Sequence, residues 1–141
     1  MKKFILMILP IFMLSACDFG KKYTVGTDAF CVGLEQDSGE SVFCKDANGQ
    51  PLNGMVVQYF ADGKIAREIT VKNGRENGVE KEYYENGNLK VYAIIKNGFP
   101  VETSKLYHKN GQLHMIVKWT DAGARIIKIY DESGNVISSG K

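Results

Sequence analysis

The sequence predicts an all-β fold: an antiparallel β-meander built from tandem hairpin repeats of about 24 residues, forming a single elongated or coiled sheet. A recurring tyrosine is the first observation behind this prediction, because it returns at steps of 24, 24 and 23 residues. A glycine follows each tyrosine four residues later. The tyrosines are Tyr59, Tyr83, Tyr107 and Tyr130, and the glycines are Gly63, Gly87, Gly111 and Gly134. A period of this length is typical of a repeat array rather than of an enzyme with a unique site.

Alternating apolar residues after each turn glycine are the second observation. Apolar side chains occupy every second position, which indicates strands with one buried face. The alternating positions are Ile65, Ile69 and Val71, then Leu89, Val91, Ala93 and Ile95, then Leu113, Met115, Val117 and Trp119. Arg67 is the one polar residue in these columns, and we expect a buried stem with its charged head in water near an edge.

Frequent Asn-Gly pairs are the third observation. Both residues tolerate the positive φ that two-residue type I′ hairpin turns require. We therefore expect such a turn at each Gly63-type position and a second one at Lys72-Asn73-Gly74 and Lys96-Asn97-Gly98. Two turns and two strands per unit give about eight to ten short strands.

The first 16 residues have the pattern of a secretory signal. Lys2 and Lys3 precede a short apolar run that ends at Leu14-Ser15-Ala16-Cys17, and this run is too short to span a bilayer as a helix. The tetrapeptide resembles the lipobox of bacterial lipoproteins, which implies cleavage before Cys17 and lipidation of that cysteine. An ordinary secretory signal that contains a cysteine is the alternative.

Lipidation of Cys17 would anchor the mature chain to a membrane without spanning it. Residues 17–28 then form a lipidated N-terminus and flexible tether, since they are polar and show no periodicity. The resemblance to lipoproteins also makes Asp18 informative, because an aspartate after the lipidated cysteine favours the periplasmic side of the inner membrane. The outer membrane remains open.

Cleavage before Cys17 would leave a formally neutral chain. It removes Lys2 and Lys3 and no acid, so Lys+Arg falls from 18 to 16 against 16 Asp+Glu. A neutral chain without a basic character argues against nucleic-acid binding.

Residues 29–141 are expected to form the repeat domain, with an N-terminal hairpin cap over 29–51 and repeats over 52–137. Two short β-prone runs flank Gln36-Asp37-Ser38-Gly39 and predict a hairpin that brings Cys31 and Cys44 together. A disulfide fits an oxidising envelope compartment, and two unpaired thiols are the alternative.

The unit Asn-Gly-x-x-x-x-Tyr-Tyr-x-Asn-Gly-x-Leu-Lys, seen best from Asn77-Gly78 to Lys90, resembles the MORN-like repeats of the bacterial YwqK-type antitoxin family. The resemblance covers about residues 45 to 137, and Glu102 replaces the leading glycine in the third unit. It implies an all-β repeat sheet that binds another macromolecule, with neutralisation of a cognate toxin as the expectation for members named as antitoxins. The repeat name is also associated with phospholipid binding.

No catalytic constellation stands out, and we expect neither an enzyme nor a cofactor. His108 and His114 flank one turn and could approach each other, but they lack a further ligand at metal-binding spacing. The recurring tyrosines are expected to be structural. The candidates for partner binding are irregular apolar residues between them, which exceed what one buried face requires: Phe60, Tyr84, Tyr92, Ile94, Ile116 and Trp119.

These patterns together predict a lipid-anchored envelope lipoprotein with a non-catalytic repeat module that binds a protein, either a toxin or an envelope component. An immunity protein against a toxin is the sharper version. A lipid- or glycan-binding envelope protein and a structural spacer are the alternatives.

Overall fold

The fold is all-β, as the sequence predicts. The structure is a computed structural model and describes residues 20–34 and 41–140. Eleven strands lie in these residues, slightly more than expected, and no helix does. The strands are β1 (Lys22–Thr24), β2 (Phe30–Val32), β3 (Phe43–Lys45), β4 (Gly54–Tyr59), β5 (Ile65–Lys72), β6 (Arg75–Tyr83), β7 (Leu89–Lys96), β8 (Phe99–Tyr107), β9 (Leu113–Thr120), β10 (Gly123–Tyr130) and β11 (Val136–Ser139).

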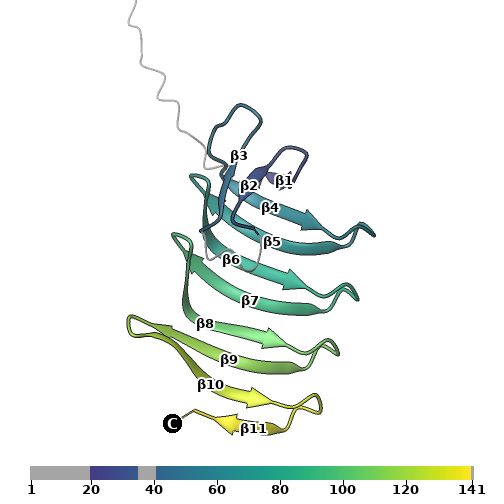
Figure 1. The fold of residues 1–141 in the computed structure, drawn as a ribbon, viewed down its shortest axis with the longest axis vertical. Helices are drawn as coiled ribbons and strands as arrows, with labels where there is room; N and C mark the ends of the chain where they lie inside the picture. The colour runs from purple at the N-terminus through teal and green to yellow at the C-terminus, as the bar shows by residue number, and fades with distance from the viewer. Residues whose placement is uncertain (1–19, 35–40, 141) are drawn as a thin grey trace, which may run out of the picture.

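A single open sheet contains the repeats. Its order is β1-β4-β5-β6-β7-β8-β9-β10-β11, and every pairing from β4 onward is antiparallel. Figure 1 shows the curved strands stacked along the long axis of the molecule, with the Gly63-type turns on one side and the Asn73-type turns on the other. Each unit is therefore one hairpin, and the second type of turn joins it to the next hairpin.

The two turn types differ in backbone chemistry. Asn73 and Gly74 have φ of 50° and 78°, and Asn97 and Gly98 have φ of 53° and 84°, which fits the predicted type I′ turns. At the Gly63-type turns the prediction is wrong, because only the glycine has positive φ among the described turn residues. Asp62 instead accepts a hydrogen bond from the backbone N–H of Lys64 at 3.0 Å. This bond from the Asp62 side chain to the backbone, together with the positive φ of Gly63, forms a hairpin loop that is longer than a two-residue turn.

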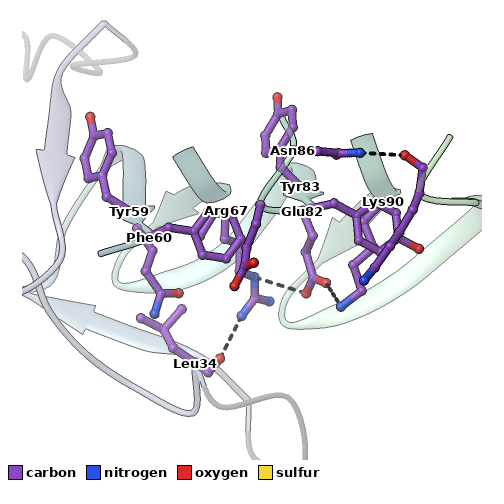
Figure 2. Close-up of a pocket in the computed structure, with 13 residues that line it drawn as sticks. Leu34, Tyr59, Phe60, Arg67, Glu82, Tyr83, Asn86 and Lys90 are labelled. Atoms are coloured by element: carbon purple, nitrogen blue, oxygen red, sulfur yellow. Dashed lines mark hydrogen bonds and ion pairs between the residues drawn. The ribbon is translucent and has the colours of Figure 1, made fainter. Parts of the chain in front are cut away.

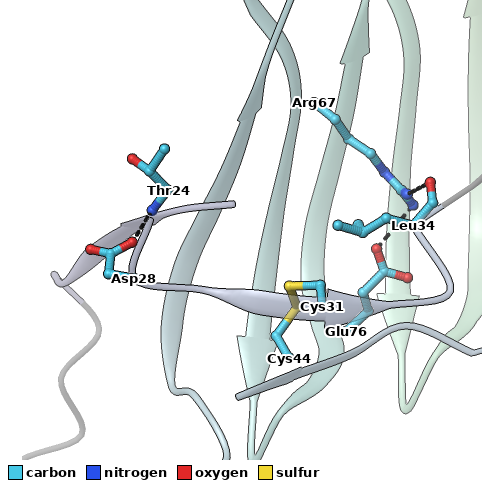
Figure 3. Close-up of a disulfide and its surroundings, with 7 residues drawn as sticks. All are labelled: Thr24, Asp28, Cys31, Leu34, Cys44, Arg67 and Glu76. Atoms are coloured by element: carbon cyan, nitrogen blue, oxygen red, sulfur yellow. Dashed lines mark hydrogen bonds and ion pairs between the residues drawn. A yellow bond between two sulfur atoms is a disulfide. The ribbon is translucent and has the colours of Figure 1, made fainter. Parts of the chain in front are cut away.

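The cap over residues 29–51 contains the expected hairpin pair. Strands β2 and β3 are antiparallel, and Cys31 lies directly opposite Cys44. The two cysteines form a disulfide with an Sγ–Sγ distance of 2.03 Å (Figure 3). The expected turn at residues 36–39 lies outside the described residues. The disulfide therefore links the two strands of the cap to each other.

The main hydrophobic core lies between the cap and the first strands of the sheet. Cap residues Ala29, Val42 and Cys44 are buried against sheet residues that include Val56 and Ile69. We call this side of the sheet the cap-side face, and the opposite side the far face. Residues directly opposite each other in an antiparallel pair share a face, so the register assigns a face to side chains beyond the cap.

The prediction of a flexible tether over residues 17–28 is wrong for the end of this range. Lys22–Thr24 form β1, which pairs in parallel with β4, and Tyr23 is buried in the core. The many polar residues of this segment hid the strand, which is held on the sheet edge by the burial of Tyr23, the packing of Val25 against the core and a hydrogen bond from the backbone N–H of Val25 to the carbonyl of Val57. Cys17, Asp18 and the signal segment 1–16 lie outside the described residues.

Candidate functional site

A cluster of charged side chains lies on the cap-side face where the cap meets β5 and β6. The guanidinium of Arg67 donates from Nε to Oε1 of Glu80 at 2.9 Å and from Nη2 to Oε1 of Glu76 at 3.1 Å. A further short contact joins Nη2 to Glu80. Nη1 donates to the backbone carbonyl of Leu34 in the cap at 3.2 Å (Figure 3). The arginine thus connects the sheet to the cap.

Two more charged groups complete this cluster. Oε1 of Glu82 lies 3.8 Å from Nε of Arg67, and Oε2 of Glu82 lies 3.4 Å from Nζ of Lys90 (Figure 2). Three carboxylates therefore face one guanidinium and one ammonium. Buried charges of this kind are stable only when each is paired and hydrogen-bonded.

The expectation that the head of Arg67 lies in water is wrong. Its side chain is only 14% exposed, because β6 supplies counter-charges directly beside it. Glu82 is opposite Arg67 in the register, and Glu80 is opposite Ile69. Glu76, Glu80 and Glu82 are separated by even numbers of residues on β6, so their side chains point to one face of the sheet. This pattern could have predicted the cluster, but the predicted alternation covered only the strand that follows each turn glycine.

Glu76 holds its proton unusually tightly for a carboxyl group. Burial raises its pKa to about 7, and the neighbouring carboxylates of Glu80 and Glu82 add to the rise, whereas Arg67 opposes it. The ion pair alone would lower the pKa, so desolvation outweighs it here. The protonation of this cluster therefore changes near neutral pH.

An open cavity of about 620 Å³ adjoins the cluster. Arg67, Glu82 and Lys90 line it together with Phe60 (Figure 2). Tyr84 also belongs to its lining. The cavity offers an aromatic surface beside charged groups, an arrangement that suits a side chain or small ligand with apolar and polar parts.

The cavity lies where a regular contact between repeats is interrupted. The hydroxyl of Tyr84 donates to the backbone carbonyl of Tyr107 at 2.8 Å, and Nε2 of His108 lies 3.0 Å from the carbonyl of Tyr130. Phe60 occupies the equivalent position 24 residues before Tyr84 and has no polar atom for this bond. The first repeat therefore leaves its ring free to line the cavity.

Turn asparagines make similar contacts between repeats. Asn86 and Asn88 both donate through Nδ2 to the carbonyl of Lys109 at 2.8 Å, and Asn110 donates to the carbonyl of Glu132 at 2.8 Å. In the first turn, Nζ of Lys64 donates to the carbonyl of Glu85 at 2.9 Å. Side chains at the Gly63-type turns therefore tie each unit to the next.

The six residues predicted to bind a partner do not form one surface. Phe60 and Tyr84 line the cavity. Tyr92 and Ile116 flank Lys105 on the far face, and Ile94 shares that face with Tyr92 because both alternate along β7. Trp119 shares the cap-side face with Val117, and its Nε1 donates to Oγ of Ser104 at 2.8 Å. The structure thus distributes these candidates over three places.

The recurring tyrosines differ in their contacts. The hydroxyl of Tyr83 donates to Oε2 of Glu68 at 2.8 Å, and burial together with this carboxylate raises the pKa of Tyr83 to about 12. Tyr59 is exposed, with Nζ of Lys22 6.0 Å from its ring centre. Lys128 lies 5.8 Å from the ring centre of Tyr130. The tyrosine that recurs in each repeat therefore makes different contacts in different repeats.

The hairpin brings the two histidines together, as the sequence suggests. The rings of His108 and His114 stack with centroids 4.2 Å apart. In the described part of the chain, no three His, Cys, Asp or Glu side chains are grouped so that they could hold a metal ion.

The described residues also contain no helix that is long and apolar enough to cross a membrane.

The fold and these contacts define a β-repeat protein with an open sheet. Residues 52–73 and 76–97 match the family model described as MORN repeat variant. The chain therefore contains MORN-like repeats, which indicates a repeat-based binding module. The first matched segment contains β4 and β5, the second contains β7 and all of β6 except its first residue, and the later hairpins continue the same arrangement. No curated protein and no solved structure gives a significant match.

Proposed function

We propose that this protein is a lipid-anchored lipoprotein of the bacterial envelope whose repeat sheet binds a protein partner. The supporting observation is the apolar cap-side face, which extends beyond the cap. Figure 1 shows β2 and β3 in front of the first strands of the sheet, whereas the later strands have no described element in front of them. An apolar sheet face without a covering layer is a typical protein-binding surface.

The exposure of this face rises along the sheet. The exposed fraction is 2% at Ile69 beneath the cap, 3% at Ala93, 9% at Val117 and 46% at Ile126. Ile126 is opposite Val117 in the register, so the two share the cap-side face. Half-buried Leu106, Met115 and Trp119 belong to the same region. A partner would cover these side chains as the cap covers Ile69.

Immunity against a toxin is the finer proposal. It is supported by the MORN-like repeats, by their resemblance to antitoxin proteins, and by the lipid anchor that the sequence predicts at Cys17. An anchored binding module would intercept a toxin at the membrane where the toxin acts. The periplasmic side of the inner membrane is the proposed location because of Asp18.

Membrane fractionation tests the anchor. Cys17→Ser removes the thiol that lipidation requires, so the variant is expected in the soluble fraction while the wild type sediments with membranes. Retention of the variant in membranes after a high-salt wash would contradict anchoring through Cys17.

Co-purification after mild crosslinking tests the partner. We expect one toxin-like protein to be recovered with the wild type, and much less with Met115→Glu, because a charge on the apolar face would have to be desolvated on binding. Glu132→Lys, an exposed turn variant, is the control. Loss of the partner with both variants, or recovery of no toxin-like protein, would contradict immunity through this face.

A glycan ligand is a second candidate because of the cavity. Aromatic rings of Phe60 and Tyr84 stand beside Lys90 and Glu82, and such groups suit the apolar faces and hydroxyls of a sugar. Sedimentation with purified peptidoglycan tests this candidate: wild type would pellet and Phe60→Ser would not. A wild type that stays in solution would end it.

A further inference from the structure

The far face carries a row of alternating basic and apolar residues across five successive strands. Each of these residues lies directly opposite the next one on the neighbouring strand. From β6 to β10 they are Lys81, Tyr92, Lys105, Ile116 and Lys128. Because opposite residues share a face, all five point to the same side of the sheet. We call this row the basic row.

Two further cations lie beside the basic row. Lys118 follows Ile116 by two residues on β9 and therefore shares its face, and Arg125 is opposite Lys118 on β10. Lys105, Lys118 and Arg125 are exposed. The far face of β6–β10 thus carries five cations around two half-buried apolar side chains.

These cations have no carboxylate partner in the part of the chain that the structure describes. The ion pairs there involve Lys64, Arg67 and Lys90. Acids are concentrated on the cap-side face, where Glu80 and Glu82 belong to the Arg67 cluster. Glu68, the acid that continues the row on β5, is bonded to the hydroxyl of Tyr83. A nearly neutral chain therefore presents one strongly positive face.

The spacing of the basic row selects the shape of a partner. Neighbouring strands are about 4.8 Å apart, so the three lysines repeat at about 9.6 Å with an apolar residue midway. An α-helix rises about 1.5 Å per residue, so positions seven apart are separated by about 10.5 Å and the intervening position by about 5 Å. An extended chain brings same-side residues about 6.7 Å apart and matches neither interval.

We propose that the far face binds an acidic amphipathic helix of a partner protein, laid across β6–β10. Glutamates or aspartates at heptad spacing would pair with Lys81, Lys105 and Lys128, and apolar side chains between them would contact Tyr92 and Ile116. This surface lies opposite the cap-side face proposed above, so the two sites are independent.

A designed peptide tests the proposal. The probe is a fluorescently labelled helical peptide of about three heptads, with Glu and Leu alternating along one face at three- and four-residue steps. Its anisotropy is titrated with the full-length chain in a nonionic detergent. A second peptide of the same composition in scrambled order controls for net charge, and vesicles with anionic lipids replace the peptide in a third arm.

The expected result is saturable binding of the heptad peptide and at least tenfold weaker binding of the scrambled one. Lys105→Glu should weaken binding about tenfold or more, since reversal at the centre of the row introduces repulsion. Lys45→Glu makes the same change of charge on the cap and should leave binding unaltered; unchanged thermal melts of both variants confirm folding.

Equal binding of both peptides would overturn the proposal, because only overall charge would then matter. An equal effect of Lys45→Glu and Lys105→Glu would overturn it for the same reason. Vesicle binding without peptide binding would assign the basic row to a membrane surface instead. The cap-side proposal survives any of these results, since its test uses the other face.

Discussion

The hydroxyl of Tyr84 donates a hydrogen bond to the backbone carbonyl of Tyr107, 2.8 Å away and one repeat further along the chain. The equivalent residue of the next repeat, His108, makes the corresponding contact with Tyr130. These bonds join consecutive units in addition to the strand ladders. In a repeat array, stability depends on such contacts between neighbouring units, so they are suitable sites for testing the fold.

Removal of this hydroxyl should weaken the array. Tyr84→Phe leaves the carbonyl of Tyr107 without its side-chain donor, and we expect the free energy of unfolding to fall by about 1 kcal/mol. Tyr59→Phe is the matched control, because Tyr59 is exposed, and it should change stability by less than about 0.5 kcal/mol. Urea denaturation of both variants measures the difference. Equal effects would show that the Tyr84 contact contributes nothing.

Loss of Arg67 should be far more damaging. Arg67→Met leaves three carboxylates facing only Lys90, and breaking a buried ion-pair cluster in this way costs roughly 3–5 kcal/mol. Lys64→Met removes an exposed ion pair with Asp62 and an exposed bond to the carbonyl of Glu85, and it should have a much smaller effect because solvent screens exposed pairs. Denaturant melts at pH 8 measure both. A mild effect of Arg67→Met at this pH would mean that water reaches the cluster.

The protonation of Glu76 should make stability depend on pH. Its folded pKa of about 7 lies above the ordinary 4.5, so the folded state keeps the proton between these values while the unfolded state has lost it. The contribution to stability is therefore complete below pH 4.5 and is lost as pH rises through 7. Compared with Glu76→Gln, the wild type should lose roughly 1–3 kcal/mol over this range. Parallel curves for both proteins would contradict the raised pKa.

Reduction of the Cys31–Cys44 disulfide should lower the melting temperature. The bond closes a loop with a sequence separation of 13 residues, for which the loss of unfolded-chain entropy amounts to about 3 kcal/mol. The double variant Cys31→Ala/Cys44→Ala should melt at a similarly reduced temperature with or without reductant. If reductant leaves the wild-type melt unchanged while both thiols react with an alkylating agent, the bond is not formed in solution.

Replacement of Glu102 by glycine should stabilise the protein. Glu102 has φ of 58°, in the position where the earlier units have Gly54 and Gly78, and this conformation costs a non-glycine residue about 1 kcal/mol or more. Glu102→Gly should therefore raise the free energy of unfolding by up to about 1 kcal/mol. Glu85→Gly, at a turn residue without positive φ, should lower it instead. If both variants changed the free energy of unfolding in the same direction, backbone strain at Glu102 would be excluded as the cause.

Much of the fold could be predicted because its signals are local and repeated. The interval between tyrosines, the alternation around Ile69 and Ala93, and the turn at Asn97 each follow from the chemistry of neighbouring residues. The hairpin containing Cys31 and Cys44 was predictable for the same reason. Strand β1 was not, since only its pairing with β4 and the burial of Tyr23 make it a strand.

The candidate site was less predictable because it depends on contacts between strands. In the sequence, Arg67 is a polar residue among alternating apolar ones, and its role is not evident. Only the pairing of β5 with β6 brings Glu80 and Glu82 beside it. Tyr84 and Phe60 look equivalent in sequence, but only the tyrosine can reach the next unit. The basic row likewise arises only when residues from five strands are aligned.

Photo-crosslinking from Ile126 in the intact envelope tests the central proposal, protein binding through the cap-side face, most directly. Ile126 is 46% exposed, so a photoreactive residue can replace it with little disturbance of the core. The same residue at exposed Ala47, in the cap, is the control. We predict one discrete protein adduct from position 126 and none from position 47. No adduct at 126, or the same adducts from both positions, would contradict the proposal.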